Sequence, residues 1–470
     1  MKVTSGQANP SFAKYAGRQR PRAGGLRGLV RLLTPTDFLL VTFLVAVAVG
    51  TTALMLPGST RGGIRFIDAL FTATSAVCVT ALKVVDTGST FTRQGQAIIL
   101  ALVQIGGLGI MSFSVIAVVM SGRRVSLRGR TIVTDALIPH LSTESIAVLK
   151  LVFVSTLLME GGGMLLLWLF APDRGWFDSL FHAVSAFCNA GLSLNADNLV
   201  RYRYNAGVNL TVCLLIVAGG LGFATHLELR KLLARTPRFR LSLQSRLVLV
   251  TTASLVLGGA IGFYVIESRN ALQGEGTWSA ILISLFHSIT ARTAGFHTIE
   301  LTRLSNATLF MLILLMFVGA SPGSTGGGIK TTTLGVLVGM ARSRIRGDEG
   351  VHLFYRSVPR ATVAKALSVL VLGFSLVTLA VVALAFVEIG NKPFQESDKQ
   401  FIEIFFEVVS AFGTVGLSTG ITPRLSVLGK FILVLVMFVG RVGPLTVAAA
   451  VGRQQARGKF RYAEENVMVG

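Results

Sequence analysis

One short motif returns four times along this chain at intervals of about 110 residues, and this spacing limits the fold more than any other feature. Each copy begins with phenylalanine, continues through small and hydroxyl residues, and ends at an alanine or a glycine. The four end positions are Ala81, Gly191, Gly295 and Gly416. Self-similarity at a fixed period indicates one supersecondary unit used repeatedly. The chain is therefore predicted to be four copies of a helix, a turn of small residues and a second helix.

A glycine-rich motif follows the turn in every copy. The four motifs are Gln104–Gly109, Val217–Gly222, Val318–Gly323 and Val439–Gly443. Small residues at such spacing often do no more than let two membrane helices pack closely. Because the glycines follow the same kind of turn each time, we interpret the two motifs as parts of one unit. An acidic residue near the start of three predicted short helices suits the helix dipole: Asp68, Asp178 and Glu403.

The segments between these motifs are apolar enough to cross a bilayer. Apolar residues make up 52% of the chain, charged residues make up 14%, and the mean hydropathy is +0.67. A membrane span needs about 20 mostly apolar residues. Examples are Phe38–Leu56, Ile146–Phe170, Leu247–Ile266 and Ala364–Val387. The sequence therefore predicts an all-α membrane protein with eight transmembrane helices, two in each repeat.

The repeats are predicted at residues 36–122, 146–230, 246–345 and 362–452. Residues 1–35 and 453–470 are predicted to be cytoplasmic tails. The formal net charge of +22 does not indicate a nucleic-acid partner, because the basic residues follow alternate loops instead of one soluble face. Their bias of roughly two to one toward one side places both termini in the cytoplasm. Anionic lipids or an acidic cytoplasmic partner would suit the excess charge.

The turns have the composition of a cation pore. Irregular backbone at membrane depth is tolerated only where it is buried in protein or lines water. Four such turns around one axis would present rings of backbone carbonyls, which can replace the hydration shell of a cation. Glycine suits backbone angles that disfavour a Cβ atom. We therefore expect a pseudo-four-fold central pore lined by the four turns.

These turns resemble the filter loops of the Trk/Ktr/HKT superfamily of potassium transporters, and the likeness to the membrane subunits of bacterial Ktr systems (KtrB type) is strongest. The resemblance implies that backbone carbonyls of the turns bind K⁺ as the transported ion. The filter residues so implied are Val79, Thr80 and Ala81; Asn189, Ala190 and Gly191; Thr293, Ala294 and Gly295; and Thr414, Val415 and Gly416.

The resemblance also implies the setting of the chain. It implies a homodimer in a bacterial cytoplasmic membrane, with one pore in each subunit and a cytoplasmic RCK-type regulatory ring (KtrA type). The chain contains no phosphate-cradling G-x-x-x-x-G-K-[ST] motif. We therefore expect no cofactor on this chain and expect any nucleotide to bind the regulatory partner.

The first turn departs from the family pattern, because Ala81 stands where the family has glycine. A Cβ atom on a left-handed residue costs about 1–2 kcal/mol. In plant relatives a serine at this place accompanies sodium permeation. We therefore expect weaker selectivity for potassium over sodium than an all-glycine filter would have.

The second helix of the third repeat is predicted to be interrupted at residues 319–333, because glycine, proline and hydroxyl residues crowd there. In the resembling family this segment is an intramembrane loop that obstructs the pore. Arg441, within the last apolar segment, is implied to face the pore as an electrostatic barrier; the alternative is that it snorkels to the headgroups. The implied gate residues are Gly319, Ser321, Pro322, Gly323, Gly326, Gly327, Gly328, Lys330 and Arg441.

Several other ionisable residues favour structural roles. Glu160 is predicted to be buried and hydrogen-bonded, with ion binding as the alternative. His182 and His287 are predicted to cap or pack, and Arg292 is predicted to brace its own loop. The three cysteines are scattered through apolar segments, which favours packing over a disulfide framework or a zinc site.

Two other functions compete with a channel. A sodium-selective or sodium-coupled secondary transporter also uses broken helices at mid-membrane, although such folds generally show two-fold repeats. Sodium could alternatively act only as an activator. An enzyme is disfavoured, because the sequence shows no paired carboxylates, zinc-ligand spacing or nucleophile–base pair in a plausible site.

Overall fold

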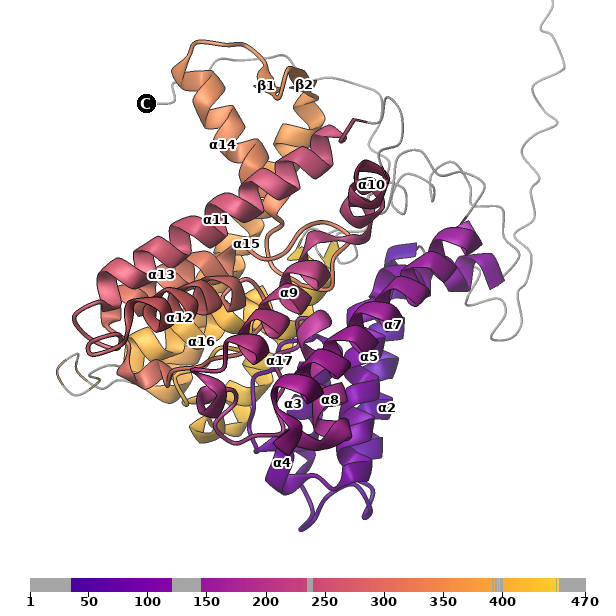
Figure 1. Cartoon of the computed structure of the whole chain (residues 1–470), viewed down its shortest axis with the longest axis vertical. Coiled ribbons are helices and arrows are strands. Elements are labelled where there is room, and N and C mark those ends of the chain that lie inside the picture. The colour runs from indigo at the N-terminus through magenta and orange to yellow at the C-terminus, as the bar shows by residue number, and fades with distance from the viewer. Residues whose placement is uncertain are drawn as a thin grey trace, which may run out of the picture.

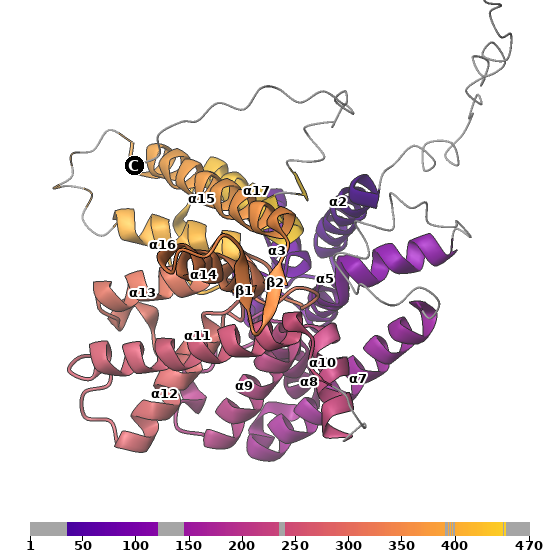
Figure 2. The same ribbon diagram turned by 90° about the horizontal axis from the view of Figure 1, so that it is seen from above.

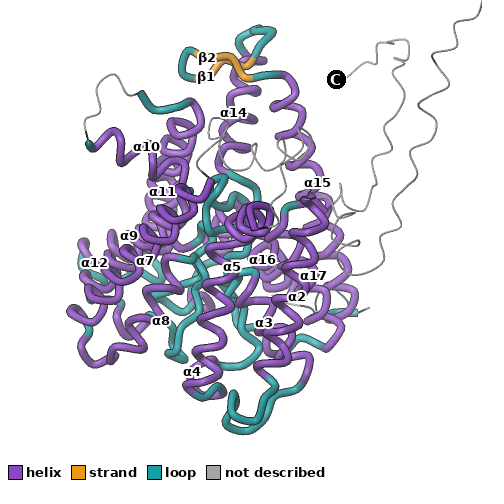
Figure 3. The backbone as a smooth tube through the Cα atoms, turned by 90° about the vertical axis from the view of Figure 1, so that its right-hand side faces the viewer, coloured by secondary structure: helices purple, strands orange, loops and turns teal. Residues whose placement is uncertain are grey.

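The computed structural model describes residues 35–120, 145–234, 240–390 and 400–444, together with residues 393, 395, 397, 446 and 447. These parts are almost entirely helical (Figure 1). The hairpin of β1 (Val351–Leu353) and β2 (Arg356–Val358) lies at one end of the molecule. The one-turn helix α4 (Thr87–Thr90) lies at the opposite end, as Figure 3 also shows. The predicted tails, residues 1–35 and 453–470, lie outside the described residues except for Pro35, which begins α2.

The described helices fall into four successive segments. The first contains α2 (Pro35–Leu54), the short helix α3 (Phe66–Val77), α4 and α5 (Arg93–Met120). The second contains α7 (Ser145–Phe170), η2 (Pro172–Arg174), α8 (Gly175–Phe187), η3 (Val200–Tyr202), α9 (Ala206–Leu221) and α10 (Phe223–Leu233).

The third and fourth segments repeat this order. The third contains α11 (Leu243–Glu267), α12 (Thr277–Thr290), η4 (Leu301–Arg303), α13 (Asn306–Phe317) and α14 (Thr331–Ile345). The fourth contains α15 (Arg360–Glu388), α16 (Gln400–Gly413), η6 (Thr422–Arg424) and α17 (Val427–Val442). The β1–β2 hairpin joins the two, and Val351 and Val358 pack with Val336 of α14 and Ala366 of α15.

Seen from above, the segments follow one another around the molecule (Figure 2). The first contacts the second through α5 and α7, and the second contacts the third through α9 and α12. The third contacts the fourth through α13 and α16, and the ring closes where α17 packs on α3. One continuous hydrophobic core runs through all four segments, and the short helices α3, α8, α12 and α16 lie within it.

Among the described residues, three helices are long and apolar enough to cross a membrane: Val152–Phe170 of α7, α11 and α15. The pair α9 and α10, which is bent by 107° at its break, provides a fourth span if it is counted as one. Much of the outward surface of these helices is apolar, as Leu158 and Leu379 illustrate with 71% of their surface exposed. Such a surface indicates a multi-pass membrane protein.

The ends of the helices are specified locally. Asp68, Asp178 and Glu403 lie in the first turns of α3, α8 and α16, which confirms the expected placement of negative charge at the helix N-terminus. Three of the second helices begin with a side-chain cap, from Asn205 on α9, Ser305 on α13 and Ser426 on α17. Each cap satisfies a backbone N–H group that the first turn leaves without a partner.

Three of the second helices break at the last glycine of the glycine-rich motif, and in the third segment α13 already ends at Phe317, so that this glycine lies within the irregular segment. Gly109, Gly222, Gly323 and Gly443 have φ angles of 57°, 81°, 71° and 96°. These angles are open to glycine and cost other residues about 1–2 kcal/mol. The interruption was expected only in the third repeat, where it is longest. There α14 already begins at Thr331, so the irregular segment ends at Lys330 and not at residue 333.

Candidate ion pathway

The four turns share one backbone conformation. In each turn the end position and the residue two places before it have positive φ angles, between 50° and 88°. The pairs are Val79 and Ala81, Asn189 and Gly191, Thr293 and Gly295, and Thr414 and Gly416. Five of these eight residues carry a Cβ atom, and each costs about 1–2 kcal/mol in the left-handed region. Backbone strain of this kind collects at functional sites.

The ends of the turns meet in the middle of the molecule. A Cβ atom added to Gly191 would overlap the carbonyl oxygen of Ala294, and one added to Gly295 would overlap that of Val415. A Cβ atom added to Gly416 would overlap the carbonyl oxygen of Thr80 and lie 2.5 Å from the methyl group of Ala81. Carbonyl oxygens from different turns therefore converge on the same small volume.

Each turn is anchored to its own short helix. Thr80 N donates to Ser75 O at 2.8 Å. In the same way, Ala190 N donates to Ser185 O and Val415 N donates to Ser410 O. The helix hydroxyl adds a second bond in three turns: Ser185 Oγ donates to Leu192 O, Thr290 Oγ1 donates to Phe296 O, and Ser410 Oγ accepts from Gly416 N. The Oγ atom of Ser75 has no partner among the described residues, so the turn that carries Ala81 lacks this second anchor.

A second tie lies farther along two of the turns. His182 Nε2 lies 2.9 Å from Ser193 Oγ, two residues past Gly191. The equivalent position of α16 is Glu407, which is fully buried and accepts from Ser418 Oγ at 3.1 Å and from Thr422 Oγ1. In both turns, these bonds hold the residues that follow the turn against the short helix that precedes it.

The glycine-rich motifs pack against the C-terminal ends of the short helices. A Cβ atom on Gly106, Gly219 or Gly440 would overlap the carbonyl oxygens of Val77, Phe187 and Phe412, respectively. Close packing through small residues, the simpler interpretation of these motifs, is therefore part of their role. The positive φ of the final glycine is the other part.

The irregular segment 318–330 lies against the turns. Gly327 N donates to Thr414 Oγ1 at 3.0 Å, and a Cβ atom on Gly326 would overlap Thr293 Oγ1. Backbone bonds tie the segment to neighbouring helices: Ser321 N to Gly220 O, Thr325 N to Gly219 O and Gly328 N to Gly440 O. Segment 318–330 thus bridges the second and fourth segments directly beside the converging carbonyls.

Two partly buried cations contact the backbone of this segment. Lys330 Nζ donates to Gly326 O at 2.7 Å. The guanidinium of Arg441 donates to Thr325 O of segment 318–330 and to Gly106 O of α5. Arg441 therefore contacts protein carbonyls from two other segments, whereas snorkelling would point it toward the headgroups.

An ion pair that the sequence analysis missed joins the first and fourth segments. Lys430 Nζ of α17 lies 2.9 Å from Asp68 Oδ1 of α3, and both side chains are at most 5% exposed. Arg65 Nε lies 2.8 Å from the other carboxylate oxygen. A single lysine in the apolar run 427–440 requires a partner at membrane depth, and this signal was present in the sequence.

Replacing Lys430 by methionine is expected to lower the free energy of unfolding by about 3 kcal/mol, the lower end for removing one partner of a buried ion pair, because Arg65 still compensates part of the buried charge on Asp68. Thermal unfolding in detergent measures the change. The double variant Lys430→Met with Asp68→Asn should recover most of the loss. Equal stability of Lys430→Met and the native chain would contradict the prediction.

The remaining candidates have structural surroundings. Glu160, 3% exposed, accepts from Gln104 Nε2 at 3.0 Å, as expected for a hydrogen-bonded role. His287 stacks on Phe263 at 4.9 Å between ring centroids. Arg292 was expected to brace its loop, but its Nε has no partner among the described residues. The three cysteines are free and buried, which confirms their packing role.

The chemistry of the site suits a weakly bound monovalent cation. The described residues contain no group of three or more histidines, cysteines or carboxylates that could hold a transition metal. The oxygen atoms that converge on the turns are backbone carbonyls, the ligand type that replaces the hydration water of potassium.

Comparison with known proteins agrees with this chemistry. Residues 31–457 match the family TrkH, described as cation transport protein, which is a transport family and not a class of enzymes. The chain is 37% identical to the Ktr system potassium uptake protein B of Bacillus subtilis, over 93% of this chain and 97% of that protein. It is 36% identical to the potassium/sodium uptake protein NtpJ of Enterococcus hirae, over 93% and 98%.

The fold also has a solved counterpart. The structure is similar to the crystal structure of the potassium transporter TrkH from Vibrio parahaemolyticus, with a TM-score of 0.71 and 16% sequence identity. The match covers 89% of this chain and 85% of that chain. At this identity the likeness concerns the fold.

Proposed function

Because this chain belongs to the TrkH family of cation transport proteins, we propose that it is the ion-translocating subunit of a potassium uptake system. The cation crosses the membrane between the four turns, whose backbone carbonyls form the selectivity filter. The observation that carries the proposal is the shared pair of left-handed residues in all four turns, together with the convergence of their end positions.

Segment 318–330 and Arg441 form the gate in this proposal. The segment lies against Thr293 and Thr414 of the filter turns, on the path that a cation leaving the filter would take. Arg441 holds the segment through Thr325 O and adds a positive charge beside the path. Opening requires these bonds to be exchanged for others, so that the two states can differ by a few kcal/mol.

Conduction of Na⁺ beside K⁺ is part of the proposal, and its support is the relative named as a potassium/sodium uptake protein. The alternative is a sodium-coupled or sodium-selective secondary transporter. Proteoliposomes loaded with K⁺, Rb⁺ or Na⁺ test the function through the flux of each ion. Flux without a sodium gradient, and an ohmic current in a planar bilayer, would support a channel. Strict dependence of K⁺ flux on co-transported Na⁺ would overturn it.

Ala81→Gly is expected to raise the ratio of K⁺ flux to Na⁺ flux a few-fold. Ala81 has a φ of 64°, and its turn lacks the hydroxyl anchor that the other three turns have. The backbone carbonyls of this turn are therefore the least constrained of the four. Glycine removes about 1–2 kcal/mol of strain at this position. Paired ⁸⁶Rb⁺ and ²²Na⁺ uptake measures the ratio.

A matched control for this variant is Ala190→Gly, which lies in the second turn outside the left-handed positions. It deletes a buried methyl group without relieving backbone strain. An unchanged flux ratio in Ala81→Gly, or an equal rise in both variants, would contradict the assignment of selectivity to Ala81.

The assembly is proposed from the family and from the relatives whose names place them in Ktr systems. We propose a homodimer in a bacterial cytoplasmic membrane, with eight transmembrane helices in each subunit and both termini in the cytoplasm. A cytoplasmic RCK-type ring regulates it and carries the nucleotide. Flux measured with and without such a ring protein tests the regulation, and cross-linking in native membranes tests the dimer.

A further inference from the structure

A cleft of about 310 Å³ opens between the first and second segments, and Gly88 of α4 is among its lining residues. It is separate from the filter and from segment 318–330. Its charged lining consists of Arg61, Arg93, Arg174 and Asp178. Three guanidinium groups and one carboxylate make the cleft electropositive.

Arg174 is the central residue of this cleft. Its surface is only 8% exposed, and its Nε, Nη1 and Nη2 atoms have no hydrogen-bond partner among the described residues. The guanidinium lies over the ring of Tyr202, with Cζ 4.0 Å from the ring centroid. A stacked guanidinium keeps the N–H groups at its edge available for a ligand.

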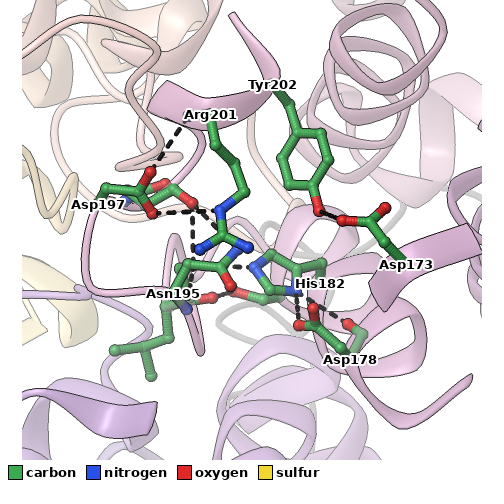
Figure 4. A network of polar contacts seen from close by, with 11 residues as sticks. Asp173, Asp178, His182, Asn195, Asp197, Arg201 and Tyr202 are labelled. Atoms are coloured by element: carbon green, nitrogen blue, oxygen red, sulfur yellow. Dashed lines mark hydrogen bonds and ion pairs between the residues drawn. The ribbon is translucent and has the colours of Figure 1, made fainter. Parts of the chain in front are cut away.

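A network of polar contacts holds Tyr202 and Asp178, the neighbours of Arg174 (Figure 4). The hydroxyl of Tyr202 donates to Asp173 Oδ2 at 2.9 Å, which fixes the ring that carries the arginine. Asp178, the carboxylate of the cleft, has Oδ1 at 2.7 Å from His182 Nδ1. His182 Nδ1 also lies 2.8 Å from the backbone carbonyl oxygen of Asp178, so the histidine keeps this carboxylate beside α8. No hydrogen bond joins the carboxylate to Arg174 in the described part of the chain.

A buried cation with unsatisfied N–H groups is costly unless a ligand accepts from it. The cleft offers the matching elements. The N-terminus of α8 begins at Gly175 beside Arg174, and exposed Arg93 reaches the rim, where its Cζ lies 5.5 Å from the ring centroid of Phe177. Arginine and a helix N-terminus together suit an oxyanion with several acceptor atoms.

We propose that this cleft binds a phosphate-class oxyanion, carried either by the headgroup of an anionic lipid or by free inorganic phosphate. Trp176 lines the rim and is 61% exposed, as expected of an aromatic side chain at a membrane–water interface, and this favours the lipid as the source. The oxyanion accepts hydrogen bonds from Arg174 and joins the residues of the first and second segments that line the cleft.

The test uses the full chain in nanodiscs. The discs contain phosphatidylcholine and phosphatidylglycerol, with about one lipid in five anionic. Native mass spectrometry then counts the phosphatidylglycerol molecules that stay bound to the protein. Arg174→Gln should lower retention of the anionic lipid about tenfold or more, because charge-assisted bonds are lost. Arg93→Gln, an exposed rim variant, should lower it several-fold. Arg303→Gln changes an exposed arginine of η4 in the third segment and should leave retention unchanged.

A second arm uses phosphatidylcholine discs with inorganic phosphate as the only oxyanion. A rise in the Tm of the native chain that is absent in Arg174→Gln identifies free phosphate as a ligand of the same cleft. If Arg174→Gln does not fold, Arg93→Gln decides both arms. The proposal is overturned if neither lipid retention nor the phosphate-dependent Tm differs between the native chain and the cleft variants, or if Arg303→Gln lowers retention equally.

Discussion

Replacing Arg441 by alanine is expected to raise K⁺ flux in the absence of a regulatory partner by about tenfold or more, because hydrogen bonds from a charged donor contribute about 1.5–3 kcal/mol each. The guanidinium bridges Thr325 O of segment 318–330 and Gly106 O of α5. Alanine removes both bonds and the positive charge beside the path. The closed arrangement loses stability, and the barrier to a cation falls. Initial rates of ⁸⁶Rb⁺ uptake into proteoliposomes measure the change.

Two further substitutions separate the bonds from the charge. Arg441→Lys keeps the charge but cannot bridge two carbonyls on different segments in the way a guanidinium does. Arg441→Gln keeps a donor and removes the charge. If the positive charge forms most of the barrier, the flux of Arg441→Gln should resemble that of Arg441→Ala. If the hydrogen-bonded bridge forms most of it, the flux of Arg441→Lys should resemble that of Arg441→Ala. Unchanged flux in Arg441→Ala would contradict the role of Arg441 in the gate.

Local features of the fold were predictable because they depend on few residues. The repeated turn placed the short helices, and acidic residues such as Asp68 and Asp178 placed their N-termini. The interruption that contains Gly323 was predictable from the surrounding glycine and proline. The equivalent breaks at Gly109 and Gly222 were not expected, although the repeat itself aligned these residues with Gly323.

Contacts between distant segments could not be predicted in the same way. Lys430 and Asp68 are 362 residues apart, and the pairing of their side chains depends on how the fourth segment closes on the first. The sequence signal was only a lone lysine in an apolar helix. Arg174 gave no signal at all, because its burial results from packing on Tyr202. A single sequence specifies periodicity and helix ends, whereas such contacts follow from the packing of the whole chain.

Gly416→Ala is expected to reduce K⁺ uptake roughly a hundredfold, since displacing an ion-binding or reacting group by about 1 Å can have an effect of that size. Gly416 has a φ of 88°, and an added Cβ atom would overlap the carbonyl oxygen of Thr80. The methyl group of Ala81 lies 2.5 Å from the same point and 3.3 Å from the equivalent point on Gly295. The space where the turns meet therefore accommodates one methyl group, and Ala81 already occupies it.

Two variants distinguish this steric effect from backbone strain. Gly420 follows Gly416 by four residues and has a φ of 93°, and a Cβ atom there would meet nothing within 4 Å. Gly420→Ala therefore carries the strain without the overlap, and its uptake should fall by a small factor only. Adding Ala81→Gly to Gly416→Ala removes the second methyl group but keeps the overlap with Thr80, so uptake should recover in part. Full uptake by Gly416→Ala would show that these carbonyls do not line the path. An equal loss in Gly420→Ala would assign the effect to strain, because the two glycines differ in what their Cβ atoms would touch and hardly in φ.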